Sequence, residues 1–251
     1  MVKRMLQVLV VVAAAAGMLT LLFLAVKTKK LQVNRWVVKD SDTVGVDISE
    51  YQADVDMEKL AEQNVQFIYM KATEGSGFTD SRFADNWTAA KACGIPAGAY
   101  HFFSFDSPGS MQAQNYIDTV GPLGDRSLIP AVDVEFYADK RNDPPEREEL
   151  IRELGDFLDA LEEEYHVKPM IYAPREICEK YLLGHFDEYP RWVRSIYYPV
   201  TFETGDSWVL WQYSDTGELE GYLGGEHYID LDVLNRGITL DDITIGGSQN
   251  R

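Results

Sequence analysis

The sequence predicts an α/β fold: a modified (β/α) barrel of about five β/α units, closed by additional strands and preceded by one N-terminal transmembrane helix. Short apolar segments alternate with helical patterns from residue 44 onward, which is typical of a mainly parallel sheet with crossover helices. After Trp192 the connections are short and rich in Gly, Asp and Tyr, so the last strands should follow one another without helices. A long uncharged apolar segment near the N-terminus predicts the preceding helix.

The barrel strands are expected in eight apolar segments, with helical stretches between the first six. Eight strands within roughly 200 residues permit a small barrel. An open doubly wound sheet is the alternative, but no GxGxxG motif follows the first strand, so a dinucleotide-binding fold lacks its fingerprint. The expected strands are residues 44–49, 66–72, 95–103, 128–135, 169–173, 192–197, 208–213 and 228–233.

The clearest helical pattern covers residues 145–165. Asp143-Pro144-Pro145 starts it, and acidic residues occupy its first turn, where the helix dipole is positive. Its apolar residues form one stripe, which predicts one buried face and a solvated acidic face opposite. The stripe consists of Leu150, Ile151, Leu154, Phe157, Leu158, Leu161 and Tyr165.

The uncharged segment, residues 5–26, is long enough to span a hydrocarbon core of about 30 Å. We expect an uncleaved anchor, with residues 1–4 in the cytoplasm and the rest of the chain outside a cell membrane that it crosses once. A cleaved signal peptide is the alternative and would give a secreted protein. Against it, the apolar run exceeds the usual ~7–15 residues, and Phe23-Leu24-Ala25 is a poor cleavage site. Residues 27–43 then form a polar tether, 44–240 one domain, and 241–251 a polar, frayed tail.

Charge divides the chain at the same place as hydropathy. The net charge is −18, but residues 1–43 carry seven basic and two acidic side chains, which leaves −23 on residues 44–251. This acidic domain disfavours nucleic acid as a partner, because phosphates bind to basic surfaces. We expect a monomer that meets the membrane only through its N-terminal helix.

Cysteine and histidine usage gives little sign of a metal or redox site. Cys93 and Cys178 lie in predicted helices without CxxC spacing, so two free buried thiols are favoured over a disulfide. The four histidines form no HxxH, HxxxH or HExxH pattern, so no zinc site is signalled. We expect His101 to be a packed, hydrogen-bonded barrel residue, and Trp87 and Trp192 to belong to the core.

Acidic residues near the C-terminal ends of three predicted strands are the informative ones. The side chain of Asp47 is expected on the opposite face of its strand from its apolar neighbours. Asp133 and Glu135 are two positions apart and therefore share a face, as Asp230 and Asp232 do. An acid inside an apolar strand is unfavourable unless it is paired or solvated. Because barrel active sites are built at the C-terminal ends of strands, these acids are expected to converge on one mouth.

Paired carboxylates in different environments suit the cleavage of a glycosidic bond. One stays protonated and donates to the leaving oxygen, while the other is ionised and stabilises positive charge at the sugar. A lone D-x-E motif occurs by chance in many proteins. The combination of Asp133 and Glu135 with the acids on two other strands is what favours a catalytic site.

Six ordered motifs resemble those of the glycoside hydrolase family 25 muramidases, the Chalaropsis-type lysozymes. The resemblance covers about residues 44–236, and it implies the same modified barrel. The motifs are GVDISEYQ at 45–52, FIYMKATEG at 67–75, GIPAGAYHF at 94–102, PAVDVE at 130–135, WQYS at 211–214 and IDLD at 229–232.

The resemblance implies an N-acetylmuramidase that cleaves the β-1,4 bond between N-acetylmuramic acid and N-acetylglucosamine in peptidoglycan, without a cofactor. It makes Glu135 the general acid. Asp133 would stabilise the positively charged intermediate, directly or by orienting the N-acetyl group of the substrate as an internal nucleophile. Asp47 and Asp230 would hold the sugar and tune this pair.

The resemblance also implies substrate contacts. Tyr100 would lie near the reacting centre, and Trp211, followed by Gln212, offers a face for sugar stacking as readily as a core position. Lys71 and Glu74 would contact substrate, or would form a structural ion pair.

Three departures from the family pattern concern the substrate groove rather than the carboxylates. The family often has Asn at the position of Asp232, Asn within the segment Ala173-Pro174-Arg175, and a small residue at the position of Arg194.

Two other functions remain open at this stage. A non-catalytic peptidoglycan-binding module on the same fold is disfavoured by the retained acids. A metal-dependent deacetylase or a glycosyltransferase using Asp230-x-Asp232 is disfavoured by the histidine spacing.

Overall fold

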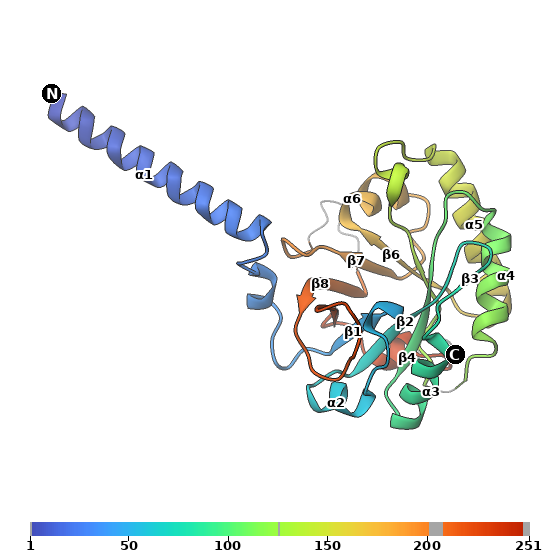
Figure 1. The fold of residues 1–251 in the computed structure, drawn as a ribbon. Helices are drawn as coiled ribbons and strands as arrows, with labels where there is room; N and C mark the ends of the chain where they lie inside the picture. The colour runs from blue at the N-terminus through green and yellow to red at the C-terminus, as the bar shows by residue number, and fades with distance from the viewer. Residues whose placement is uncertain (1, 125, 201–207, 248–251) are drawn as a thin grey trace.

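The computed structural model describes residues 2–124, 126–200 and 208–247 (Figure 1). Its strands form one sheet that closes on itself, because β1 pairs with β9 on one side and with β2 on the other. The predicted modified barrel is therefore confirmed. The strands are β1 (Val44–Ile48), β2 (Phe67–Glu74), β3 (Phe78–Thr79), β4 (Ala97–Phe102), β5 (Ala131–Asp133), β6 (Met170–Pro174), β7 (Arg191–Arg194), β8 (Leu210–Gly217) and β9 (Ile229–Leu234).

Strand direction separates the repeating part of the barrel from its closure. Pairing is parallel from β1 through β2, β4, β5, β6 and β7 to β8. The last strand, β9, runs antiparallel to both β8 and β1. Of the described strands, only β3 lies outside the barrel, as a short antiparallel partner of β2 that the sequence did not predict. No long helix lies between β7, β8 and β9 in the described residues, and the last part of the barrel is closed by strands, as expected.

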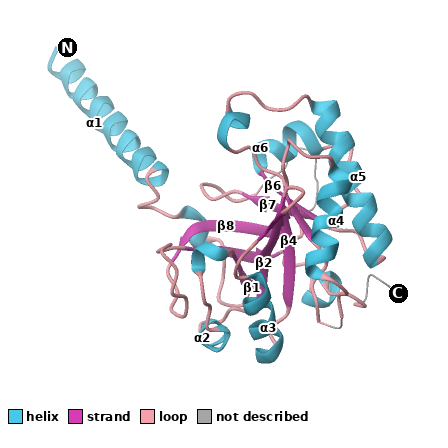
Figure 2. Ribbon diagram, turned by 45° about the vertical axis from the view of Figure 1, so that its right-hand side comes forward, coloured by secondary structure: helices cyan, strands magenta, loops and turns pink. Residues whose placement is uncertain are grey.

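Helices cover the outside of the parallel strands (Figure 2). Each of the first five barrel strands leads into one of them, which gives the expected five β/α units. The fourth, α5, begins two residues later than predicted and ends at Tyr165 as predicted. The helices are α2 (Met57–Glu62), α3 (Phe83–Cys93), α4 (Gly109–Val120), α5 (Arg147–Tyr165), and α6 (Arg175–Ile177), which continues into a π-helical turn, Cys178–Leu182.

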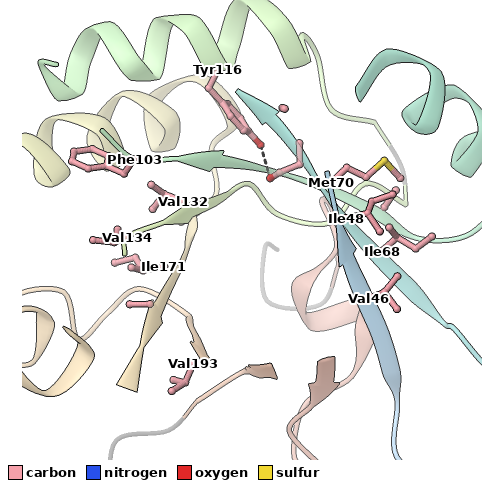
Figure 3. Close-up of a cluster of buried hydrophobic side chains, with 14 of the residues drawn as sticks. Val46, Ile48, Ile68, Met70, Phe103, Tyr116, Val132, Val134, Ile171 and Val193 are labelled. Atoms are coloured by element: carbon pink, nitrogen blue, oxygen red, sulfur yellow. Dashed lines mark hydrogen bonds between the residues drawn. The ribbon is translucent and has the colours of Figure 1, made fainter. Parts of the chain in front are cut away.

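Alternation along the strands divides the apolar core into two layers. Ile68 and Met70 of β2 point outward and pack with Val46, Ile48 and the helices (Figure 3). Phe67 and Tyr69 belong to the second cluster, in the barrel interior, with Tyr100, Tyr172 and Trp192.

Two glycines make room for the aromatic rings inside this small barrel. A Cβ added to Gly45 would lie 2.4 Å from the Phe67 ring, and one added to Gly98 would lie 2.3 Å from the Tyr69 ring. The rings fill the interior below the mouth. The centroid of the Trp192 ring lies 4.9 Å from the ring centroids of both Tyr69 and Tyr172. These rings form an aromatic floor that closes the barrel beneath the C-terminal ends of the strands.

The N-terminal helix, α1 (Val2–Lys27), projects away from the barrel (Figure 1). Residues 3–27 are long and apolar enough to cross a membrane, and their most apolar part is not buried against the domain.

The segment that follows α1 is docked on the barrel, at the place where a polar tether over residues 27–43 was expected. We call residues 28–43 the strap. Within it, residues 33–36 form a 3₁₀ turn whose Asn34 is 1% exposed. Asn34 Nδ2 donates to the carbonyls of Ser195 (2.7 Å) and Tyr213 (3.0 Å). Further along, Arg236 binds Asp42 through two nitrogens, each at 2.8 Å.

The C-terminal segment is also more ordered than expected. Residues 241–251 were expected to fray, yet Ile243 is buried in the barrel interior and accepts a hydrogen bond from Ile129 N at 2.9 Å. Ile245 N donates to Ser127 O at 2.8 Å. The physical reason is that these two isoleucines interrupt an otherwise polar segment. Residues 248–251 lie outside the described part of the chain.

Both cysteines are free thiols, as expected. Cys178 is fully buried, whereas Cys93 is only partly buried at the end of α3.

Asn34→Ala is expected to lower the free energy of unfolding by about 1–3 kcal/mol, because the buried carbonyls lose their donor. Chemical denaturation of the full-length chain in detergent micelles measures this loss. Trp36→Ala, in the same turn but 72% exposed, is the matched control and should change stability by less than about 0.5 kcal/mol. Equal losses in both variants would contradict a docked strap.

Candidate active site

The C-terminal ends of the parallel strands surround a cavity of about 430 Å³. Four predicted acids line it: Asp47 from β1, Asp133 from β5, Glu135 from the loop after β5, and Asp230 from β9. The structure thus brings together side chains that are far apart in the sequence. The predicted strand 128–135 is wrong at its end, because β5 stops at Asp133 and Glu135 lies two residues beyond it.

Asp47 and Asp230 form one half of the cluster. They lie opposite each other in the antiparallel β1–β9 pair. Gln212 Nε2 donates to Asp47 Oδ2 at 2.8 Å and to Asp230 Oδ2 at 3.2 Å. Burial raises the pKa of Asp47 to about 6 and raises that of Asp230 well above its ordinary value, the Asp47 charge adding to the latter. Gln212 is therefore a buried residue that holds two carboxyls.

Asp133 and Glu135 form the other half. Asp133 is 8% exposed, and its Oδ1 has no hydrogen-bond partner among the described residues. Burial, together with the nearby Glu135 and Asp47 charges, raises the pKa of Asp133 well above its ordinary value. Burial also raises the pKa of Glu135, against the opposing charges of Arg194, Arg141 and Lys71. Glu135 is the more exposed of the two, so it is the acid that can hold a proton and still reach a ligand in the cavity.

A fifth acid, Asp232, lies beneath the cavity and is fully buried. Trp192 Nε1 donates to its Oδ1 at 2.8 Å. Its Oδ2 has no hydrogen-bond partner among the described residues. Burial and the Asp47 charge raise the pKa of Asp232 well above its ordinary value. A neutral Asp232 presents one acceptor and one donor, as an Asn side chain would.

Lys71 and Glu74 were expected either to contact substrate or to form a structural ion pair. Lys71 Nζ pairs with Glu74 Oε2 at 2.6 Å, which is the structural ion pair. Lys71 also lies 4.7 Å from the centre of the Phe102 ring and lines the cavity, whereas Glu74 is not among the lining residues.

Aromatic side chains surround the acids, but Trp211 is not one of them. Tyr100 lines the cavity as expected, beside Tyr172. Trp211 is 3% exposed, donates through Nε1 to Ser195 O at 3.0 Å and packs against Trp208, so it presents no face to the cavity. Of the two positions expected for Trp211, the structure shows the core position, because the ring belongs to the outer core.

Several lining residues escaped the sequence analysis. Tyr51 and Tyr228 are exposed aromatic residues at the rim, and Tyr51 could have been found because it lies within the GVDISEYQ motif. Arg194 was noticed only as a departure from the family pattern. The other lining side chains without an earlier signal are Phe102, Arg141, Tyr172, Asp215 and Glu226.

His101 and the two core tryptophans lie where the sequence placed them. His101 is fully buried, and its ring nitrogens bond Thr73 Oγ1 at 2.7 Å and Gln112 Oε1 at 3.0 Å. Burial lowers the pKa of His101 to about 4, so it is neutral near pH 7. Trp87 and Trp192 are buried.

The described residues contain no group of three or more His, Cys, Asp or Glu side chains arranged to hold a metal ion. The carboxyls that line the cavity can take part in proton transfer and can stabilise positive charge.

Known proteins resemble the chain over the whole barrel. Residues 46–222 match the family described as glycosyl hydrolases family 25. A solved family 25 glycosyl hydrolase from Bacillus anthracis is 41% identical, with 80% of this chain and 93% of that chain covered at a TM-score of 0.74. The uncharacterized protein YegX of Escherichia coli K12 is 33% identical over 76% of this chain and 69% of its own length. The autolytic lysozyme of Clostridium acetobutylicum is 29% identical over 82% of this chain and 61% of its own length.

Asp232→Asn is expected to stabilise the protein increasingly as the pH rises. The folded state keeps Asp232 protonated, while the unfolded chain ionises it above its ordinary pKa of 3.8. The wild type therefore loses stability as the pH rises above this value, and the amide removes that loss. The Tm difference between variant and wild type, measured from pH 4 to pH 8, should grow with pH.

Asp156→Asn, on the exposed face of α5, is the control and should show a Tm difference that is independent of pH. A constant difference for Asp232→Asn would mean that Asp232 is ionised in the folded protein.

Proposed function

We propose that this chain, which belongs to glycosyl hydrolases family 25, is an N-acetylmuramidase. It would hydrolyse the β-1,4 bond between N-acetylmuramic acid and N-acetylglucosamine in peptidoglycan. The observation that carries the proposal is the convergence of Asp133 and Glu135 with two further carboxyls in one half-enclosed cavity. The names of the lysozyme relatives support the same substrate class.

Glu135 is the proposed general acid. It must be protonated when it meets the glycosidic oxygen, and burial favours this form by raising its pKa. Its position in a loop at the cavity wall gives the carboxyl access to the leaving oxygen. Donation of the proton breaks the bond and leaves positive charge at the sugar.

Asp133 is proposed to stabilise that positive charge, directly or by orienting the N-acetyl group of the substrate as an internal nucleophile. Its Oδ1 is buried without a donor among the described residues, which leaves this atom for a group of the substrate. Asp47 and Asp230, fixed by Gln212, would hold the same sugar from the opposite wall. Tyr100 lies among all of them, and its hydroxyl stays neutral because burial raises its pKa well above its ordinary value.

The sugars on either side would lie over the rim. Tyr51 is 66% exposed and Tyr228 is partly exposed on the same side of the cavity as Asp230. Aromatic faces of this kind pack against the apolar faces of sugar rings. These two residues take the stacking role that the sequence had suggested for Trp211.

The proposed enzyme acts outside the membrane, anchored by α1. The exposed apolar length of this helix supports an anchor, and the strap that follows it is attached to the barrel. Tethering raises the local concentration of the enzyme near the wall without a separate binding module.

Glu135→Gln is expected to lower kcat by about 10²–10⁴, because the amide has the shape of the acid without its acidic proton. The full-length chain in detergent is incubated with purified peptidoglycan, and new muramic-acid reducing ends are counted. Glu148→Gln, on the exposed first turn of α5, is the control and should retain wild-type activity.

The same digest tests the alternative function. Wild-type protein that sediments with peptidoglycan but releases no reducing ends from several wall types would support a non-catalytic binding module. Full activity in Glu135→Gln would instead overturn the assigned acid.

The mature protein in the membrane fraction is expected to retain the N-terminal segment, because the apolar run lacks a good cleavage site at its end. Intact-mass measurement checks this. A mature chain that begins after Ala25 and appears in the medium would show that the segment is a signal peptide.

A further inference from the structure

Arg194 occupies the cavity wall at the position where β7 ends. Its side chain is 30% exposed, and its Nη2 lies 2.9 Å from Asp215 Oδ2 on the neighbouring strand β8. No other hydrogen bond of Arg194 is seen within the described chain. The guanidinium is therefore held from one side by Asp215 and shares the cavity with the four carboxyls.

Asp215 is shared by two cations. Lys29 Nζ of the strap lies 2.6 Å from the same Oδ2 that binds Arg194. Gln32 Nε2 bonds Thr216 Oγ1 at 2.6 Å and Arg35 Nη2 bonds Thr216 O at 3.1 Å, so the strap is attached directly beside Asp215. The first residues after the membrane helix thus contact a side chain of the cavity wall.

The charges around Glu135 come from most of the barrel. Carboxyls and cations lie around it, and burial raises the pKa of Asp47, Asp133, Glu135 and Asp230. Arg194 opposes that rise at all four. The groups are Asp47 of β1, Lys71 of β2, Asp133 of β5, Arg141 of the turn Ala138–Arg141, Tyr172 of β6, Arg194 of β7, Asp215 of β8, and Asp230 and Asp232 of β9.

We propose that Arg194 is a positioning residue that sets the charge balance at Glu135, and that Lys29 of the strap is part of this active site because it neutralises Asp215. With Lys29 in place, the Asp215 carboxylate pairs with two cations, Lys29 and Arg194. One net positive charge of this group then remains to stabilise the ionised acids of the cavity. Without Lys29, Asp215 neutralises Arg194, and the cluster becomes more negative by one charge.

The inference deepens the proposed function, on which its kinetic readout rests. For Arg194, Lys29 and Asp215 it predicts the direction in which the ionisation of Glu135 changes when the residue is replaced. Loss of a cation, at Arg194 or at Lys29, makes ionisation of Glu135 harder, so the acid form persists to higher pH. Loss of the Asp215 charge has the opposite effect. Because the acids titrate together, the effect is measured on the cluster as a whole.

The test is the pH profile of kcat/KM for the full-length chain in detergent on purified peptidoglycan. In the Arg194→Ala variant the alkaline limb should move upward by about one pH unit. In Lys29→Ala it should move upward by less, and in Asp215→Asn it should move downward. Arg194→Lys keeps the charge and should restore the wild-type limb.

Lys30→Ala is the matched control, because Lys30 is the exposed neighbour of Lys29. Its profile should overlay that of the wild type. An alkaline limb unmoved in Arg194→Ala would overturn the role of Arg194. A Lys29→Ala profile identical to that of Lys30→Ala would overturn the role of the strap.

A second readout does not depend on hydrolysis. The side-chain carboxyls of ¹³C-glutamate-labelled protein are titrated by NMR, and the Glu135 signal is identified by its absence from Glu135→Gln. Its midpoint should move in the directions given above. If the wild type cleaves no peptidoglycan while these shifts occur, the proposed function fails and the charge linkage stands. If cleavage occurs without the shifts, the linkage fails alone.

Discussion

The burial of five carboxyl groups at one end of a small barrel is the constraint on which the rest of this structure depends. Charged acids at such short range and low exposure repel one another, so the group retains protons near neutral pH. Each acid then differs by what it contacts: Asp47 and Asp230 share Gln212, Asp232 takes the Trp192 N–H, and Asp133 keeps one oxygen free. These different contacts allow one carboxyl to act as the proton donor and another to stabilise charge.

The barrel can bury these acids because its interior is closed beneath them. Phe67 and Tyr69 fill the space left by Gly45 and Gly98 on neighbouring strands, and Trp192 lies between Tyr69 and Tyr172. The floor excludes water from below and leaves one open side, the mouth. The same Trp192 that packs this floor also donates to Asp232. Trp192 therefore contributes both to the packing beneath the site and to its electrostatics.

The strap extends this linkage to the N-terminal part of the chain. Asn34 is buried against the residue after β7 and the middle of β8, and Lys29 reaches Asp215 next to the cavity. A segment that is polar by composition is thus part of the folded domain. Through Asp215 it contacts the wall of the site.

The sequence by itself determined the order of the strands and helices, the closure by strands after Trp192, and the set of acids at the mouth. These follow from alternation, because the two-residue period of a strand places Asp133 on a defined face and the C-terminal ends of parallel strands meet. Only the tertiary structure decided that Trp211 is core, that the strap is docked and that Arg194 faces the carboxyls. The docking of the strap depends on contacts between residues more than 160 positions apart, such as Lys29 with Asp215. The place of Trp211 depends on which side of a nearly all-apolar strand faces inward, and that of Arg194 on the closure of the barrel, which brings β7 beside carboxyls from other strands. Local pattern carries no information about such contacts.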